Sequence, residues 1–223
     1  MATSFPPTTD IRAAVVTGRH PFDVPGFHAV FRNIPGVDCY PQHLNDFVAD
    51  AGHVRADYHV VVFYNFHQPT PGTEDGWWAS GAREALEALG ETGQGIFILH
   101  HALLAYPEWP FWSTLCGIPD RSFSYHMGEY VHVDIADPDH PITQGLRPWT
   151  MVDETYGMND PGEDSRVLLT TEHTKSMHAL AWTHQHRNAR VFCYQSGHGN
   201  RTYTNYSFRT VVARGIRWLA GRL

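Results

Sequence analysis

Residues 58–101 read YHVVVFYNFHQPTPGTEDGWWASGAREALEALGETGQGIFILHH, in which two apolar runs flank a helical pattern. The runs, Tyr58 to Phe66 and Gly95 to His100, are almost wholly apolar, as expected of strands buried on both faces of a parallel sheet. Between them, Glu74 to Glu91 has apolar residues at helical spacing, acidic residues in its first turn and glycines at its end. The order strand, helix, strand is typical of a doubly wound α/β fold.

The same alternation extends toward the N-terminus, where the sequence predicts a strand over Ile11 to Thr17, a helix over Gly26 to Asn33 and a strand over Val37 to Pro41. The pattern changes after His101, because strand-like segments then follow one another, and a turn at residues 187–189 is typical of a hairpin. These segments are Glu129 to Ile135, Arg166 to Glu172, Met177 to Gln185 and Arg190 to Ser196.

The C-terminal stretch from Asn205 to Leu223 predicts an amphipathic helix whose apolar stripe covers one face of the sheet. No repeat or long linker divides the chain, so we predict a single α/β domain over residues 1–223, with an N-terminal tail at residues 1–10. Its central sheet should be mainly parallel and flanked by helices, as in a flavodoxin-like fold, with antiparallel strands added in the second half.

The composition limits the classes of partner. The 223 residues carry a formal net charge of −7, so the chain has no basic surplus with which to neutralise nucleic-acid phosphates. No stretch approaches the roughly 20 apolar residues of a membrane span. Aromatic residues make up 13% of the chain, and their rings are common stacking surfaces for sugars. We expect a small-molecule ligand, neither nucleic acid nor membrane, and we leave a homo-oligomer open.

Cysteine usage indicates the compartment and one absent chemistry. Cys39, Cys116 and Cys193 are far apart, odd in number and without C-x-x-C spacing, which favours a reducing cytoplasm. None stands in the strand-to-helix setting of a nucleophile. The sequence also lacks the G-x-S-x-G, G-x-G-x-x-G, Walker and H-E-x-x-H motifs of other enzyme classes.

Histidines follow several of the predicted strands, at the sheet edge where ligands bind in open α/β folds. They are His20, His67, His100, His101 and His198. Loop or core histidines are the alternative interpretation for each. Of the tandem pair we select His101, because neighbours on a strand point to opposite faces and the following turn lifts one over the strand end. Glycines on both sides of His198 free the backbone around its imidazole.

Carboxylates are fewer, and the clearest group is Asp153, Glu154 and Tyr156, between two strand-like segments. A carboxylate pair can orient an imidazole, bind a metal or move a proton, although a turn with surface acids is the alternative. His126 begins a predicted strand, where it is either a ligand or only part of the edge of the sheet. The H-x-H of His184 and His186 has metal-like spacing but adjoins the hairpin turn, so we expect it to be solvent-exposed.

Seven short segments, in order, carry a resemblance that covers nearly the whole chain. They are VTGRHPF (16–22), GIFILHHA (95–102), HPITQGL (140–146), DETY (153–156), AW (181–182), RVF (190–192) leading to GH (197–198), and RGI-x-W (214–218). Together they resemble the ThuA-like (trehalose utilisation) family, whose fold is like that of class I glutamine amidotransferases. Each segment is weak alone, and their order makes the set specific.

The resemblance implies a role in the catabolism of disaccharides and other glycosides through 3-keto sugars. His100 and His101 occupy the turn where amidotransferases carry their cysteine nucleophile, and His198 falls near their strand-end histidine. That departure makes glutamine hydrolysis an unexpected activity for this chain.

We therefore predict acid–base catalysis next to the carbonyl of a keto-sugar, leading to isomerisation or elimination. The catalytic candidates are His101, Glu154 and His198, and the substrate-binding candidates are His20, His67, His100, His126, Asp153 and Tyr156. A divalent metal such as zinc, held by several of the histidines and lost on changing His101, could polarise the carbonyl. The alternative is a non-catalytic sugar-binding or regulatory protein on the same fold.

Overall fold

The computed structural model describes residues 11–72 and 77–223, and the predicted tail at residues 1–10 lies outside them. The described strands form one nine-stranded sheet in the order β2-β1-β3-β4-β9-β8-β7-β5-β6. Its strands are β1 (Ile11–Gly18), β2 (Val37–His43), β3 (Val60–Asn65), β4 (Gly95–Leu99), β5 (Ser124–Ile135), β6 (Trp149–Gly157), β7 (Arg166–Thr170), β8 (Ala179–His186) and β9 (Ala189–Tyr194).

Six α-helices are described, with two short 3-10 turns. The helices are α1 (Val24–Arg32), α2 (Leu44–Ala49), α3 (Trp77–Glu87), α4 (Pro110–Cys116), α5 (Asn200–Tyr203) and α6 (Tyr206–Leu219). The 3-10 turns are η1 (Arg55–Asp57) and η2 (His100–Leu104). Residues 74–76, with which the helix predicted from Glu74 begins, lie outside the described residues.

The parallel half of the sheet confirms the pattern predicted from the apolar runs. β2, β1, β3, β4 and β9 all run in the same direction, and every residue of β3 and β4 is buried. The pairing of β4 with β9 sets Leu99 opposite Tyr194, so the carboxyl ends of these two strands lie side by side. The residues that directly follow β4 and β9 in the sequence therefore lie close together.

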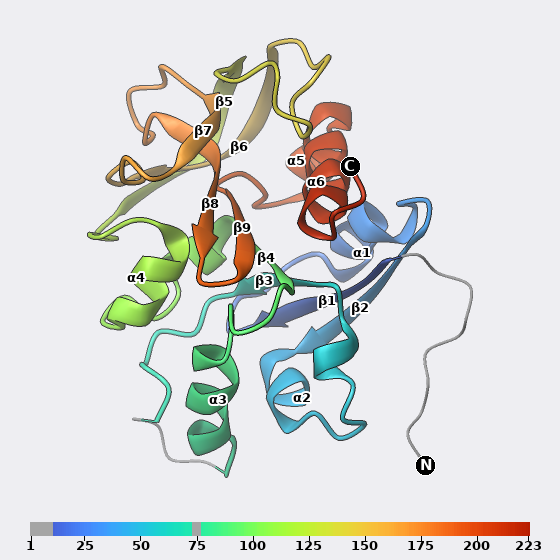
Figure 1. Ribbon diagram of the computed structural model, residues 1–223. Coiled ribbons are helices and arrows are strands. Elements are labelled where there is room, and N and C mark those ends of the chain that lie inside the picture. The colour runs from blue at the N-terminus through green and yellow to red at the C-terminus, as the bar shows by residue number, and fades with distance from the viewer. Residues whose placement is uncertain (1–10, 73–76) are drawn as a thin grey trace.

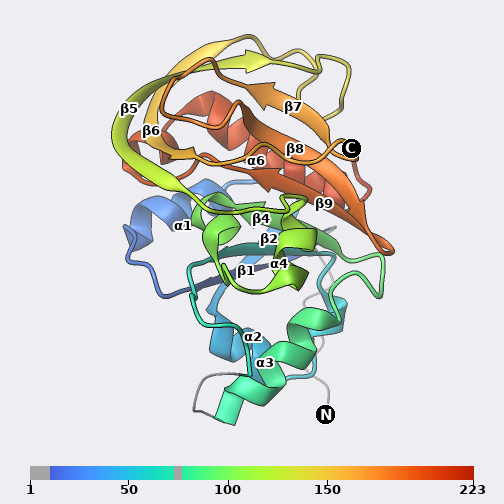
Figure 2. The ribbon, with the colours of Figure 1, turned by 90° about the vertical axis from the view of Figure 1, so that its left-hand side faces the viewer.

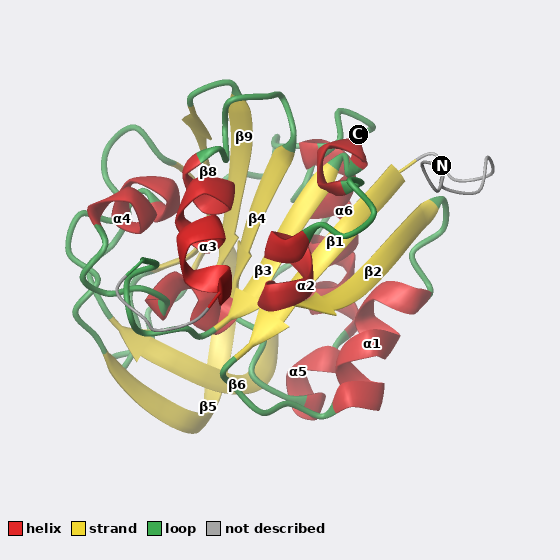
Figure 3. Cartoon of the chain, turned by 90° about the horizontal axis from the view of Figure 1, so that it is seen from below, coloured by secondary structure: helices red, strands yellow, loops and turns green. Residues whose placement is uncertain are grey.

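Helices cover both faces of this parallel half. Side chains alternate along each strand, so a buried strand has side chains on both faces of the sheet that need covering. Val15 and Val62 pack in the cluster that includes α1 and α6, whereas Val16 and Phe63 pack in the one that includes α2 and α4. Figure 1 shows α1 and α6 on one side of the strands, with α2 and α3 on the other, and Figure 3 views the sheet from that second side. The C-terminal helix thus covers one sheet face, as its apolar stripe predicts.

The second half adds antiparallel strands, as expected. β8 and β9 form the predicted hairpin, and β7, β5 and β6 extend the sheet beyond it. β5 and β6 form a long curved pair with a register shift between His126 and Glu129 (Figure 2). No helix among the described residues is long and apolar enough to cross a membrane.

One strand was absent from the sequence-based assignment. Asp153, Glu154 and Tyr156 were expected between strands, with a turn as the alternative, but they lie inside β6. The reason is that this strand is rich in buried polar side chains, including Asp153 and Thr155, which mask the apolar signal of a strand.

Candidate functional site

The site begins where β4 and β9 end. His100 directly follows β4 and has a left-handed backbone conformation, with φ of 54°, at the sharp entry into η2. Such a φ is uncommon for residues other than glycine and turns the chain abruptly. Beyond β9, Gly197 has φ of 135°, and its lack of a side chain permits the turn that presents His198. Because β4 and β9 are neighbours, the two histidines converge.

Glu154 of β6 completes the convergence. Its Oε2 lies 3.1 Å from Nε2 of His100 and 3.1 Å from Nδ1 of His198. The two imidazole nitrogens are 3.2 Å apart. Three groups that can each ligate a metal ion therefore form a nearly equilateral triangle, which we call the His–Glu–His triangle.

Hydrogen bonds hold the triangle from behind. Nδ1 of His100 donates to the carbonyl oxygen of Gln195 at 2.7 Å, which fixes the ring and its tautomer. The side-chain amide of Gln195 donates in turn to the backbone carbonyl of Glu154 at 3.0 Å. The hydroxyl of Tyr156 donates to Oε2 of Glu154 at 3.0 Å, while its ring stacks on His100.

Asp153 positions the loop that carries His198. Its carboxylate accepts the backbone N–H of Gly197 at 2.8 Å and that of His198 at 3.0 Å. Asp153 itself is buried, so these bonds act in a medium of low dielectric and are strong. The sequence-predicted Asp153 and Tyr156 thus lie at the site, with Asp153 supporting the loop rather than lining a cavity.

The triangle borders a cavity of about 470 Å³, which we call the histidine pocket. It is lined by His20, Pro21, Phe66, His101, Leu104, Phe123, Tyr125, Met127, Glu154, Tyr156 and His198. The cavity is therefore lined by all three of the predicted catalytic candidates, His101, Glu154 and His198.

His101 is the most buried imidazole on this pocket, at 2% exposure. Its ring lies 4.3 Å from that of His20 and 4.1 Å from that of Tyr64. Nδ1 of His101 has a long contact of 3.4 Å with the carbonyl oxygen of Asn65, whereas its Nε2 is buried with no hydrogen-bond partner among the described residues. A buried nitrogen without a partner is costly in a folded protein and indicates a place where a ligand binds.

The charges of the site follow from its burial and its hydrogen bonds. Burial alone would raise the pKa of Glu154, but hydrogen bonds to His100 and His198 outweigh it and lower the pKa well below its ordinary value. The hydrogen bond to Glu154 raises the pKa of His198. Burial, with the nearby His100, lowers the pKa of His101 well below its ordinary value. A carboxylate and a neutral His101 therefore face the same cavity near neutral pH.

Two predicted substrate-binding residues lie elsewhere. His67 is buried beside Asn65, whose amide is 3.3 Å from its Nδ1, and stacks on Tyr106 instead of lining the histidine pocket. His126 lies between Tyr125 and Met127, which both line the pocket, and alternation along β5 turns it to the opposite face. A position directly after a strand therefore does not by itself place a side chain in the pocket. The conformation of the turn decides which side of the sheet the side chain faces.

The H-x-H pair was wrongly expected to be exposed. His186 is buried and His184 is half-buried, with its Nε2 2.9 Å from the carbonyl oxygen of Leu115. α4 packs against this end of the hairpin and covers it, so the two imidazoles belong to the interior.

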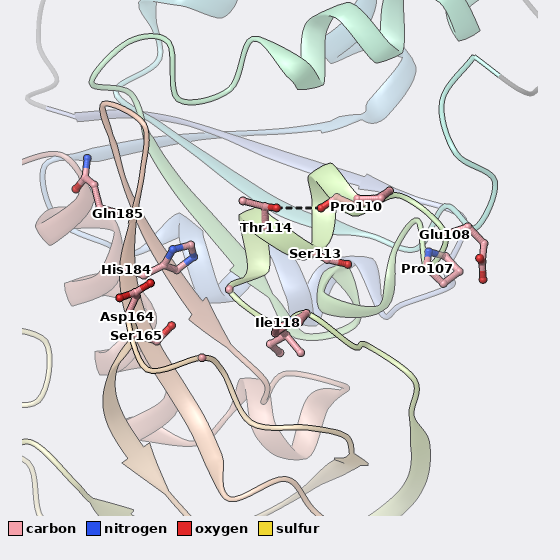
Figure 4. Close-up of a pocket in the computed structure, with 13 residues that line it drawn as sticks. Pro107, Glu108, Pro110, Ser113, Thr114, Ile118, Asp164, Ser165, His184 and Gln185 are labelled. Atoms are coloured by element: carbon pink, nitrogen blue, oxygen red, sulfur yellow. Dashed lines mark hydrogen bonds between the residues drawn. The ribbon is translucent and has the colours of Figure 1, made fainter.

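A second cavity, of about 610 Å³, lies between α4 and the β8–β9 hairpin (Figure 4). Three of its polar side chains have partners within the protein: the hydroxyl of Thr114 donates to the carbonyl of Pro110, that of Ser113 accepts from Arg121, and Nε2 of His184 donates to the carbonyl of Leu115. The histidine pocket, with its unpartnered imidazole nitrogen, is the better candidate for chemistry.

Sequence reasoning missed Gln195 and the aromatic wall of the pocket. Gln195 directly follows β9, but the predicted strand ran to Ser196 and therefore included it. Phe66, Phe123 and Tyr125 carried no comparable signal, because an aromatic residue in a strand or loop is most often structural.

The fold and the site define a class: an α/β protein with a glutamine amidotransferase-like fold whose strand-to-helix turn bears two consecutive histidines. A glutamine amidotransferase from Thermotoga maritima is similar over 93% of this chain and 98% of its own, with a TM-score of 0.53 and 9% identity. At that identity the likeness concerns the fold alone.

The family follows from the sequence itself. The ThuA family model, described as trehalose utilisation, matches residues 46–219, so the chain belongs to the ThuA family. A ThuA-like protein from Parabacteroides merdae is 22% identical, with a TM-score of 0.72, covering 94% of this chain and 90% of its own. One from Bacteroides uniformis is 16% identical, with a TM-score of 0.73, covering 98% and 95%. None of the curated proteins matches the chain. The family supports a carbohydrate-related role.

Proposed function

We propose that this protein acts on a keto-glycoside or keto-disaccharide by acid–base chemistry in the histidine pocket. The observation that carries the proposal is the unpartnered Nε2 of His101 in the same cavity as the carboxylate of Glu154 and the imidazole of His198. Membership of the family supports a carbohydrate as the substrate, and the paired imidazole and carboxylate can transfer a proton.

His101 is the base in this scheme. When its Nδ1 N–H points to the carbonyl of Asn65, the lone pair of Nε2 is free to take a proton from the carbon next to the sugar carbonyl. The electron pair left behind forms an enolate, and the protonated His198, held by Glu154, stabilises its oxygen.

Two outcomes of the enolate balance without any further reactant. In isomerisation, the hydroxyl proton on the neighbouring carbon passes to the enolate oxygen, the proton on His101 returns to the former carbonyl carbon, and the carbonyl moves to the neighbouring position. In elimination, the electron pair expels the glycosidic oxygen on the adjacent carbon, and this oxygen takes the proton from His101. Both restore neutral His101.

The test is exchange of the carbon-bound proton in deuterated water, followed by NMR with 3-ketotrehalose as substrate and unoxidised trehalose as control. We expect exchange or elimination only with the keto sugar, and a decrease of at least 100-fold in His101→Gln. Equal rates in the variant and the parent would exclude His101 as the base.

A sugar-binding protein without catalysis is the second candidate. The aromatic wall formed by Phe66, Phe123 and Tyr125 favours it, because such rings stack on sugar faces without reacting. Saturable binding of the keto sugar with no exchange and no product would support this alternative.

We also place the protein in the reducing cytoplasm. Its three cysteines are all free, and Cys116 and Cys193 are buried. Free cysteines fit a compartment that does not favour disulfides.

A further inference from the structure

We infer that the His–Glu–His triangle is the binding site of a divalent transition-metal ion, ligated by Nε2 of His100, Nδ1 of His198 and Oε2 of Glu154. The sides of the triangle are 3.1, 3.1 and 3.2 Å. Ligand atoms about 2.0–2.1 Å from a tetrahedral zinc ion are separated by about 3.3 Å, so the three atoms are already spaced as zinc ligands.

Counting protons favours a metal ion over hydrogen bonds alone. The N–H at Nδ1 of His100 is used on the carbonyl of Gln195, and its Nε2 faces the triangle. His198 supplies at most one proton at Nδ1. The hydroxyl of Tyr156, which lies 2.9 Å from Nε2 of His100 and 3.0 Å from Oε2 of Glu154, supplies one more, so two protons would have to serve five short contacts. Two imidazole lone pairs and a carboxylate oxygen facing one point are better satisfied by one cation.

The surroundings have the features of a metal centre. His100 donates its other ring N–H to a backbone carbonyl, and Glu154 accepts a hydrogen bond from Tyr156. Asp153 fixes the loop that carries the third ligand, His198. These supporting contacts orient ligands and raise metal affinity.

One side of the triangle is open to the histidine pocket, since Glu154 and His198 line it. The same cavity is lined by His101 and His20, whose Nε2 and Nδ1, respectively, are buried without partners among the described residues. Three protein ligands and an open fourth position are the arrangement of catalytic metal sites. The ion would take over from protonated His198 the stabilisation of the enolate oxygen, while His101 remains the base.

The donor set also selects the class of metal. Two imidazoles and one carboxylate suit Zn²⁺, Fe²⁺ and Co²⁺, whereas Mg²⁺ and Ca²⁺ prefer oxygen donors. The sequence suggested that metal binding would depend on His101. The structure assigns the ligand role to His100, because the left-handed turn directs that ring, rather than its neighbour, onto Glu154.

The test is titration of metal-free, untagged protein with Zn²⁺ against a chromophoric chelator. We expect one tight site per chain, and a loss of affinity of at least 100-fold in Glu154→Gln and His198→Gln. His101→Gln and the control His132→Gln, a change on the exposed part of β5, should both retain the site.

The sixteen histidines make a control for surface binding necessary. Co²⁺ substitution provides it, because the visible spectrum reports the coordination of the ion and should change in Glu154→Gln but not in His132→Gln. Equal Zn²⁺ affinity in the parent, Glu154→Gln and His198→Gln would overturn the inference, as would a parent that binds Mg²⁺ as tightly as Zn²⁺.

The metal site does not depend on the proposed reaction, and the two can fail separately. Tight zinc binding without turnover of a keto sugar would keep the site and remove the reaction. Full turnover by protein shown to be metal-free would keep the reaction and overturn the metal site.

Discussion

His100 and His101 are consecutive, yet their side chains have different surroundings. His100 is fully buried and bonded on both sides, to Gln195 through one nitrogen and to the triangle through the other. His101 has one long contact and one free nitrogen. The left-handed turn at His100 produces this division, since it sends one ring behind the site and the other into the pocket.

At this same scale, the cysteines should be dispensable. Burial raises the pKa of Cys39 and of Cys116 to about 12, so neither is a thiolate near neutral pH. Changing Cys39, Cys116 and Cys193 together to Ala should retain activity and cost about 1 kcal/mol of stability per buried site. Turnover and thermal melting of the triple variant check this. A folded but inactive triple variant would contradict it.

His67 should make the protein sensitive to acid. Burial lowers its pKa from 6.5 to about 4. Between these two values, His67 is protonated in the unfolded chain and neutral in the folded chain. Stability from this residue is therefore complete above pH 6.5 and decreases as the pH falls toward 4, by up to roughly 3 kcal/mol. In His67→Asn, urea unfolding between pH 4 and 7 should show a smaller slope with pH, and an unchanged slope would exclude the effect.

At the scale of elements, the β5–β6 pair contributes one wall of the pocket. Phe123, Tyr125 and Met127 come from β5 and the residue before it, and Glu154 and Tyr156 come from β6. The register shift in β5, between His126 and Glu129, includes Met127, and an irregularity of this kind bends a strand. This pair therefore supplies both an apolar surface and the acidic ligand.

Tyr125 should contribute to sugar affinity without contributing much to stability. Its side chain is 61% exposed and lines the pocket, a geometry suited to stacking on a sugar ring. Tyr125→Ala should weaken sugar binding roughly tenfold, measured by calorimetry. The matched control is Tyr130→Ala, which removes a ring that is 70% exposed on the same strand and does not line the pocket. Equal loss in both variants would exclude stacking by Tyr125.

Some elements could be predicted from sequence and others could not, for physical reasons. β3 and β4 are buried on both faces, so their residues are almost all apolar and the signal is strong. β6 buries Asp153, which is hydrogen-bonded to the loop of His198, Glu154, which lines the pocket, and Thr155, and its pattern resembles a turn. The proximity of His101 and His198 could be predicted, because both residues follow strands that end at the same edge of the sheet. The role of His100 depends on a single φ angle, which no side-chain pattern reports.

For the whole molecule, stability depends on how closely α6 packs on the sheet. A side chain at Gly215 would place its Cβ 2.5 Å from the ring of Phe192, so only glycine permits this approach. Gly215→Ala should destabilise the protein by roughly 1–3 kcal/mol. Gly93→Ala, at a position with nothing within 4 Å, serves as the control. Denaturant unfolding measures both, and equal stability would show that α6 shifts freely.

The insertion of β9 between β4 and β8 has a consequence for the order in which the protein becomes functional. His100 and His198 are 98 residues apart, and a chain growing on the ribosome exposes the first long before the second. Strands β1 to β4 can pair early, but the position beside β4 is filled only after β9 has been synthesised. The His–Glu–His triangle therefore cannot form until the segment that follows β9 has been synthesised.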